Sequence, residues 1–159
     1  FLGVHLLREL LVEHGATVTC ALRGVSEPRV RQSLEEKWRW FFPETALEPH
    51  GGRLHVVVTE VIAPRLGLTE RAYDALAETH GAVVNAAANV SGGGGLEEML
   101  PVNVGLVESL IELCRYGCLK HLHHVSTLSI LGHFPSRPRI DAFAERRQLD
   151  RPSARDGFS

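Results

Sequence analysis

The chain has 159 residues, 44% hydrophobic and 23% charged, which is typical of one globular domain and excludes a disordered or fibrous protein. Its formal net charge of −2 gives no overall positive field for a polyanion, so we expect no nucleic acid partner. No apolar run approaches the roughly 18 residues that cross a bilayer, and the first residues lack the basic start of a signal peptide. We therefore expect a cytoplasmic protein without membrane contact.

Apolar residues recur with the periods of helices and strands in turn along the first half of the chain. Leucines at helical spacing begin this pattern, β-branched runs interrupt it, and Pro28 is placed to open a helix. The pattern predicts a helix over residues 2–11, a strand over 17–22, a helix over 28–42 and a strand over 54–58.

The second half of the chain continues the alternation. Thr69 is a candidate N-cap for the next helix. Further segments are predicted as a strand over 82–84, a helix over 96–116 that Pro101 breaks or kinks, and a strand over 122–125. From residue 128 onward Gly, Pro and Arg accumulate without a period, so 128–159 is predicted to be loop-rich and poorly ordered.

This alternation predicts an α/β fold: a Rossmann-like, doubly wound parallel sheet with helices on both faces. The chain opens on a helix, whereas such a sheet begins with a central strand whose glycine turn leads into the first helix. We therefore expect residues 1–159 to be one partial nucleotide-binding domain, without its first strand and its C-terminal substrate-binding part.

Cysteines and histidines could bind a metal ion, but their pattern does not favour one. Cys20, Cys114 and Cys118 lack a zinc spacing and are interpreted as small apolar residues kept reduced. His121 and His123 would share one face of a strand, but no nearby carboxylate or cysteine completes a ligand set. No metal site is expected.

Residues in three parts of the sequence suggest a phosphate-bearing cofactor. Phe1, Leu2 and Gly3 are similar to the end of a glycine-rich turn, in which the helix N-terminus holds a pyrophosphate. Arg23 directly follows a predicted strand, where these folds bind the adenosine ribose, and an arginine there pairs with a 2′-phosphate. Arg29 is a second candidate for this phosphate. These positions favour NADPH over NADH, although a solvated surface arginine is an alternative for both side chains.

Six short motifs in the same order resemble one known family, the thioester reductase domains that end nonribosomal peptide and polyketide synthases. These domains are extended short-chain dehydrogenases/reductases, related to carboxylic acid reductases and fatty acyl-CoA reductases. The motifs are Phe-Leu-Gly at 1–3, Val-Thr-Cys-Ala-Leu-Arg at 18–23, Pro-Arg-Leu-Gly-Leu at 64–68, Asn-Ala-Ala at 85–87, Asn-Val at 103–104 and His-Val-Ser-Thr-Leu-Ser at 124–129.

The resemblance implies NADPH-dependent reduction of a thioester to an aldehyde or an alcohol. The substrate would be an acyl or peptidyl group on the phosphopantetheine arm of a carrier protein. By the same resemblance Glu60 and Val61 stand beside the adenine, where the family usually has Asp-Leu. Ala86 and Ala87 would let the cofactor pass close to the backbone.

The resemblance also implies roles for four polar residues. Asn85 and Ser126 join the predicted cofactor contacts, and Asn103 either braces the backbone near the site or caps a helix. Thr127 is the predicted catalytic residue, because its hydroxyl could hydrogen-bond the thioester carbonyl oxygen as negative charge develops there.

The family's proton donor is a tyrosine with a lysine four residues later. Phe158 stands where the resemblance would place that tyrosine, and a phenyl ring has no proton to give. Two alternatives to the reductase therefore remain: a redox-inactive dinucleotide-binding module, or an extended short-chain dehydrogenase similar to fatty acyl-CoA reductases or epimerases.

Overall fold

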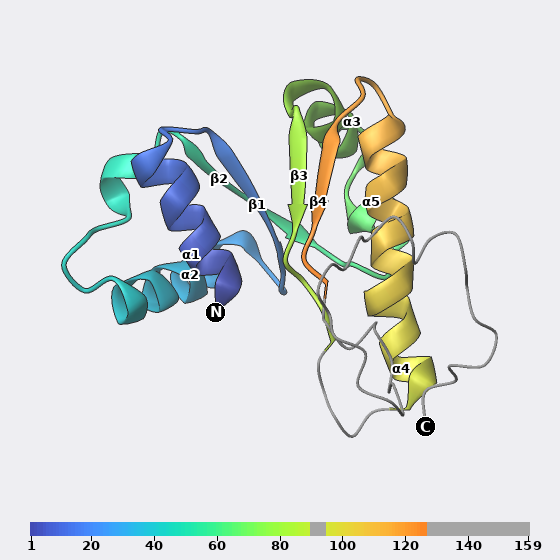
Figure 1. Cartoon of the computed structure of the whole chain (residues 1–159), viewed down its shortest axis with the longest axis horizontal. Helices are drawn as coiled ribbons and strands as arrows, with labels where there is room; N and C mark the ends of the chain where they lie inside the picture. The colour runs from blue at the N-terminus through green and yellow to red at the C-terminus, as the bar shows by residue number, and fades with distance from the viewer. Residues whose placement is uncertain (90–94, 127–159) are drawn as a thin grey trace, which may run out of the picture. The chain divides into compact units, whose positions relative to one another are not determined.

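The structure is a computed structural model of the whole chain, and it describes residues 1–89 and 95–126 (Figure 1). The chain divides into two units, Phe1–Val125 and Ser126–Ser159. All described elements belong to the first unit. The predicted loop region 128–159 lies outside the described residues.

Two pairs of parallel strands carry the fold. β1 (Val18–Arg23) pairs with β2 (Leu54–Thr59), and β3 (Ala82–Asn85) pairs with β4 (His121–His124). Parallel neighbours need long crossovers, and each pair is joined by a crossover that contains a helix. Among the described residues no strand joins β1 to β3, the place where a doubly wound sheet has its first strand.

The first core lies between the β1–β2 pair and two helices. α1 (Leu2–Arg8) continues into a π-helical turn, Glu9–Glu13, and α2 (Glu27–Phe41) has a proline in its first turn. Trp38 on α2 is 1% exposed, and its indole N–H donates to the carbonyl of Thr45 (3.1 Å). A short 3₁₀ helix, Glu48–His50, precedes β2. The buried members of this core are Val4, Leu7, Leu11, Val30, Leu34, Trp38, Leu47, Leu54 and Val56.

The second core lies between the β3–β4 pair and the later helices. It is built by the turn Pro64–Gly67, α3 (Glu70–Thr79) and α5 (Leu106–Arg115). α4 (Leu96–Leu100) leads into α5 through a π-helical turn, Pro101–Gly105. The buried apolar members are Leu66, Tyr73, Ala77, Leu106, Leu110 and Leu113.

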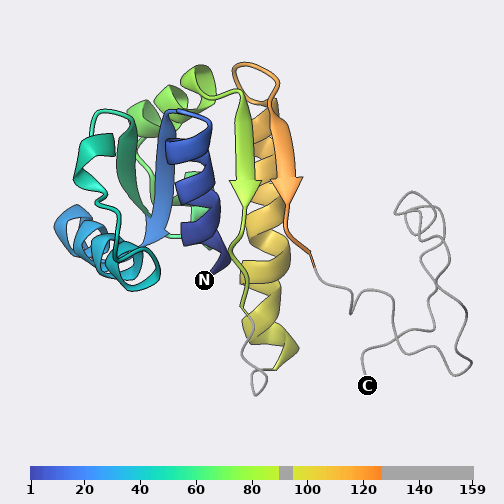
Figure 2. The ribbon, with the colours of Figure 1, turned by 60° about the vertical axis from the view of Figure 1, so that its left-hand side comes forward.

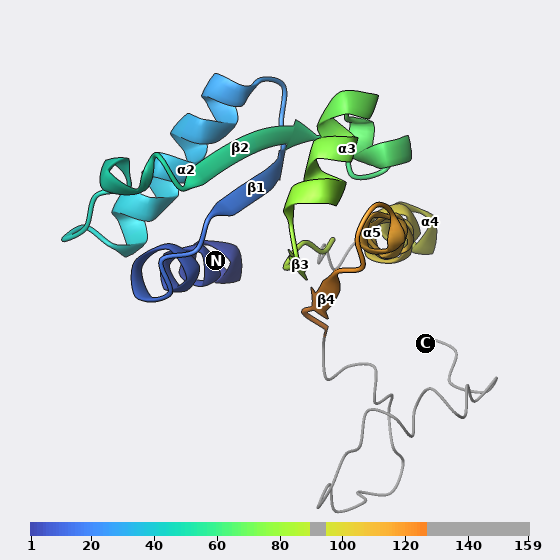
Figure 3. The ribbon, with the colours of Figure 1, turned by 90° about the horizontal axis from the view of Figure 1, so that it is seen from above.

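The helices cover the strands from opposite sides. In Figures 2 and 3, α1 and α5 lie on opposite sides of the strands, as expected for a doubly wound arrangement. The N-terminus lies at the end of the unit toward which the arrows of β3 and β4 point (Figures 1 and 2). The start of α1 therefore lies at the same edge as the carboxyl ends of these two strands.

Each element predicted for residues 1–126 is confirmed to within a few residues. Thr69 caps α3 as expected, its hydroxyl accepting from the N–H of Ala72 (3.3 Å). One of our two alternatives for Pro101, a break in the helix, is wrong. The backbone stays helical from Leu96 to Arg115, because a wider π-helical turn accommodates a residue that has no N–H.

Two of the three cysteines lie where small apolar residues are expected: Cys114 is buried and Cys20 is partly buried. Cys118 is exposed, and its thiol donates to the carbonyl of Ala77 (3.4 Å). Burial beside the first core raises the pKa of Cys20 to about 11, since an apolar environment disfavours the thiolate.

Candidate functional site

Most candidate residues gather where parallel strands end. Arg23 ends β1 opposite Thr59, which ends β2, and Glu60 follows immediately. Arg23 and Glu60 are exposed. Thr59, which pairs with Arg23 and precedes Glu60, is only 3% exposed. Ligands of open α/β sheets bind at this carboxyl edge, because the strand ends leave backbone groups free there. The arrangement offers a cation and a carboxylate to a ligand.

Arg23 is available to an anion. Its guanidinium makes no ion pair with any residue in 1–89 or 95–126. Arg29, at the start of α2, is also exposed and makes no ion pair within the same residues. The turn between β1 and α2 separates Arg23 from Arg29 and so determines the distance between them.

That turn depends on a glycine that the sequence reasoning missed. A Cβ on Gly24 would lie 2.2 Å from Cγ1 of Val30, which belongs to the first core. Only a residue without a side chain lets α2 approach the end of β1 so closely. The signal available in the sequence was the Arg-Gly pair directly after a strand.

Asn85 uses its side chain inside the protein. It is 4% exposed; its amide nitrogen donates to Nδ1 of His124 (3.1 Å), and its amide oxygen accepts from the N–H of Ala87 (3.0 Å). The amide thereby ties the carboxyl ends of β3 and β4 together and shapes the turn that follows β3. Ala86 and Ala87 in this turn are exposed, so the backbone there is open to a ligand.

Asn103 holds the same segment from the helix side. Its amide oxygen accepts from the N–H of Asn89 (2.7 Å), and its amide nitrogen donates to the carbonyl of Asn89 (3.0 Å). Of the two roles considered for Asn103, bracing a backbone or capping a helix, these bonds correspond to the brace. Asn103 lies in the π-helical turn Pro101–Gly105, and such turns are frequent at functional sites.

The first residues of the chain are open. Phe1 is 84% exposed and its ring contacts those of His5 and Phe41, with centroids 4.6 and 5.4 Å away. Leu2 is 40% exposed, and Gly3 is also exposed. No described atom lies within 4 Å of a Cβ built on Gly3. The close helix–strand packing that such a glycine serves is therefore not seen among the described residues, which include no strand beside α1 at this point.

The predicted catalytic end is only partly described. Ser126 is exposed. Thr127 and Phe158 lie outside the described residues.

The chain holds a tyrosine–lysine pair at the family's spacing, Tyr116 and Lys120, which the sequence reasoning overlooked. The pair directly precedes β4, so it lies at the amino end of that strand, away from the carboxyl edge. The Lys120 ammonium is buried and donates to the backbone carbonyls of Tyr116 (2.9 Å) and Cys118 (2.6 Å). The carboxylate of Asp74 raises the pKa of Tyr116, the opposite of what a proton donor near neutral pH needs. The pair closes the end of α5, and we expect no catalytic role for it.

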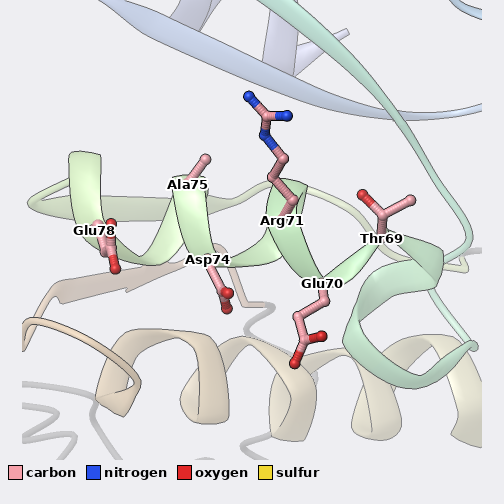
Figure 4. A pocket seen from close by; sticks show the side chains of 6 residues that line it. All are labelled: Thr69, Glu70, Arg71, Asp74, Ala75 and Glu78. Atoms are coloured by element: carbon pink, nitrogen blue, oxygen red, sulfur yellow. The ribbon is translucent and has the colours of Figure 1, made fainter.

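A shallow hollow lies elsewhere, on α3. It has a volume of about 710 Å³ and is lined by Thr69, Glu70, Arg71, Asp74, Ala75 and Glu78 (Figure 4). None of the predicted site residues lines it. Within residues 1–89 and 95–126, no group of three His, Cys, Asp or Glu side chains could hold a metal ion, and no helix could span a membrane.

Comparison with known proteins assigns the family. Residues 1–151 match the NAD-binding family described as male sterility protein. The chain is 35% identical over 146 residues to isonitrile lipopeptide synthase from Streptomyces coeruleorubidus, covering 88% of this chain and 9% of that protein. It is 31% identical over 158 residues to the hybrid PKS-NRPS synthetase pynA from Aspergillus niger, covering 94% and 4%.

A solved structure agrees with these relatives. The terminal R domain from the myxalamid PKS-NRPS biosynthetic pathway superposes with a TM-score of 0.78 at 28% identity, covering 87% of this chain and 35% of that one. The chain therefore belongs to the NAD-binding male sterility protein family. The predicted resemblance to the terminal reductase domains of peptide and polyketide synthetases is confirmed, as is the doubly wound Rossmann-like fold. The chain spans about a third of that solved domain and less than a tenth of these two synthetases.

Proposed function

We propose that this chain forms the cofactor-binding part of an oxidoreductase that uses NADPH to reduce a carrier-bound acyl or peptidyl thioester to an aldehyde or alcohol. Membership of a family of NAD-binding reductase domains supports the oxidoreductase class. The observation that carries the choice of NADPH is Arg23, an exposed guanidinium without an ion-pair partner in the described residues, at the carboxyl end of a parallel strand. A cation in this place can pair with the 2′-phosphate that NADH lacks.

The residues at this edge fit an extended dinucleotide. Arg23 and Arg29 would hold the 2′-phosphate, and Glu60 would accept a hydrogen bond from the adenine. The exposed turn at Ala86 and Ala87 would lie against the cofactor backbone, while Asn85 and Asn103 keep that turn in place through the bonds described above. When bound, NADPH supplies the hydride that reduces the thioester carbonyl.

Thr127 is proposed to act on that carbonyl. It comes three residues after the end of β4, whose carboxyl end Asn85 ties to β3. Its hydroxyl would donate a hydrogen bond to the carbonyl oxygen as negative charge develops, a contribution worth roughly 10²–10³ in rate at comparable sites. The carbon–sulfur bond then breaks, which leaves the aldehyde, and the departing phosphopantetheine thiolate takes up a proton from solvent.

The test uses the natural full-length protein, with an acyl group loaded on the phosphopantetheine arm of its carrier protein. NADPH absorbance and a trapped aldehyde are followed together in wild type and Thr127→Val. We expect the NADPH oxidised to equal the aldehyde plus twice any alcohol, because reduction of the aldehyde consumes a second hydride. The rate should be lower by roughly 10²–10³ in the variant. NADPH binding without reduction would favour the redox-inactive module that Phe158 suggests. Equal turnover of a free acyl-CoA would favour the fatty acyl-CoA reductase alternative.

A further inference from the structure

The segment after β2 contains an unusual backbone turn. Arg65, Leu66 and Gly67 follow one another in the left-handed region, with φ values of 53°, 59° and 70°. Residues with a Cβ enter this region rarely and at a cost, and two in succession persist only where surrounding contacts enforce them. Such backbone strain is a common feature of functional sites.

The turn folds back onto Glu60. The N–H of Glu60 donates to the carbonyl of Leu66 (2.9 Å), and the carbonyl of Glu60 accepts from the N–H of Ala63 (2.9 Å). The N–H of Leu66 donates to the carbonyl of Ala63 (3.0 Å). Both backbone groups of Glu60 are thus fixed by the loop that follows it.

Gly67 completes this contact because it has no side chain. A Cβ at Gly67 would lie 3.1 Å from Cβ and 3.2 Å from the backbone nitrogen of Glu60. The positive φ at Gly67 disfavours any other residue as well. Alanine here would push directly against Glu60.

Two side chains anchor the turn to the second core. Leu66 is 3% exposed and lies among the buried residues beneath α5. The guanidinium of Arg65 contacts the carboxylate of Glu70 (3.3 Å) and lies 5.7 Å from the ring centroid of Tyr73. The turn is therefore held to α3 and α5 while its other side holds Glu60.

We propose that the left-handed turn Arg65–Gly67 is a positioning device: it fixes Glu60 so that its exposed carboxylate accepts a hydrogen bond from the exocyclic amine of the cofactor's purine. This inference rests on the proposed function. A carboxylate can accept from the amine of adenine, whereas hypoxanthine carries an oxygen there and would meet the carboxylate with an acceptor. The turn thus selects adenine over an oxo-purine.

The experiment compares Kd values for NADPH and for its hypoxanthine analogue in the natural full-length protein. Wild type should bind NADPH roughly 10- to 100-fold more tightly than the analogue, the range of one hydrogen bond to a charged group. Gly67→Ala should bring this ratio close to one, mainly by weakening NADPH. Gly52→Ala is the matched control, because a Cβ there has nothing within 4 Å and its φ is not left-handed; it should keep the ratio.

A second variant guards against misfolding of Gly67→Ala. Arg65→Asn keeps a residue that tolerates the left-handed region but removes both contacts of the guanidinium, and it should lower the ratio partly. If the folded variants keep the wild-type ratio of the two Kd values, the inference is overturned. It is also overturned if the wild type binds both cofactors equally. In either case the proposed NADPH binding would stand. A wild type that binds no NADPH would instead refute the proposed function.

Discussion

Arg23 gives the sharpest test at the scale of single residues. Replacing it with Gln removes the charge that would pair with a 2′-phosphate. We expect Arg23→Gln to weaken NADPH binding by roughly 10- to 100-fold, since hydrogen bonds to charged groups are worth about 1.5–3 kcal/mol, and to leave NADH binding nearly unchanged. Titration of both cofactors measures this.

Arg39→Gln is the matched control for the same charge change. Arg39 is exposed in the last turn of α2 and is not a proposed phosphate contact, so a general electrostatic effect would appear in both variants. A larger loss from Arg29→Gln than from Arg23→Gln would move the phosphate contact to α2. Equal losses of NADPH and NADH in Arg23→Gln would contradict a phosphate role.

Tyr116 provides a prediction of no effect. Although Tyr116 and Lys120 have the spacing of a proton-donating pair, the lysine ammonium is used by backbone carbonyls and the phenol lies beside Asp74. Tyr116→Phe should therefore leave the rate of thioester reduction within about twofold, because the change touches a surface contact outside the carboxyl edge. A single-turnover assay decides this, and a fall comparable to that of Thr127→Val would restore the pair as a catalytic candidate.

At the scale of elements, the turn from β1 to α2 is sensitive to one methyl group. Gly24→Ala places a Cβ against Val30 and should lower the free energy of unfolding by about 1–3 kcal/mol, the usual cost of overpacking. It should also weaken NADPH binding, because the end of β1 that carries Arg23 must shift. Denaturant unfolding and cofactor titration measure the two effects.

Val30→Ala makes room for the added methyl group. The double variant should lose less stability than the sum of the two single changes, since the clash exists only when both original contacts are present. Strict additivity would show that the turn relaxes without involving Val30.

Sequence reasoning succeeded where periodicity or a capping residue determines an element. β1, β2 and α3 were predicted because a β-branched run or the N-cap Thr69 marks them. The left-handed turn was not predicted, because nothing in Arg65 or Leu66 favours positive φ; burial of Leu66 and the contact with Glu60 impose it. The π-helical turn at Pro101 was not predicted either, because a proline in a helical pattern indicates only a break or a kink.

At the candidate site, the sequence indicated positions more reliably than contacts. Arg23 was expected directly after a strand, and it is the last residue of β1. Glu60 was expected from the family resemblance, and it directly follows β2. Asn85 was expected among the cofactor contacts, but whether its side chain faces His124 or a ligand depends on a partner strand 39 residues away. Thr127 lies outside the described residues, and its role stays a prediction.

For the molecule as a whole, the two separate cores imply nearly independent contributions to stability. Leu7 belongs to the first core and Leu110 to the second, and the two share no cluster. Each change to Ala should cost about 2–5 kcal/mol, and the double variant should equal the sum within about 0.5 kcal/mol. Leu7→Ala with Leu34→Ala, both in the first core, should depart from additivity. A large coupling between Leu7 and Leu110 would show that the cores act as one.

The first core also has a consequence for biosynthesis. Its helices and both of its strands come from residues 1–59, a continuous stretch, and the second core needs none of the residues before β2. N-terminal segments begin to fold while the rest of a chain is still being translated, so α1, α2 and their two strands can bury apolar surface before the second core exists. A pause in translation shortly after the β2 segment has emerged should therefore leave the first core buried. A pause before that point would leave the apolar faces of α1 and α2 without the strand pair that they cover.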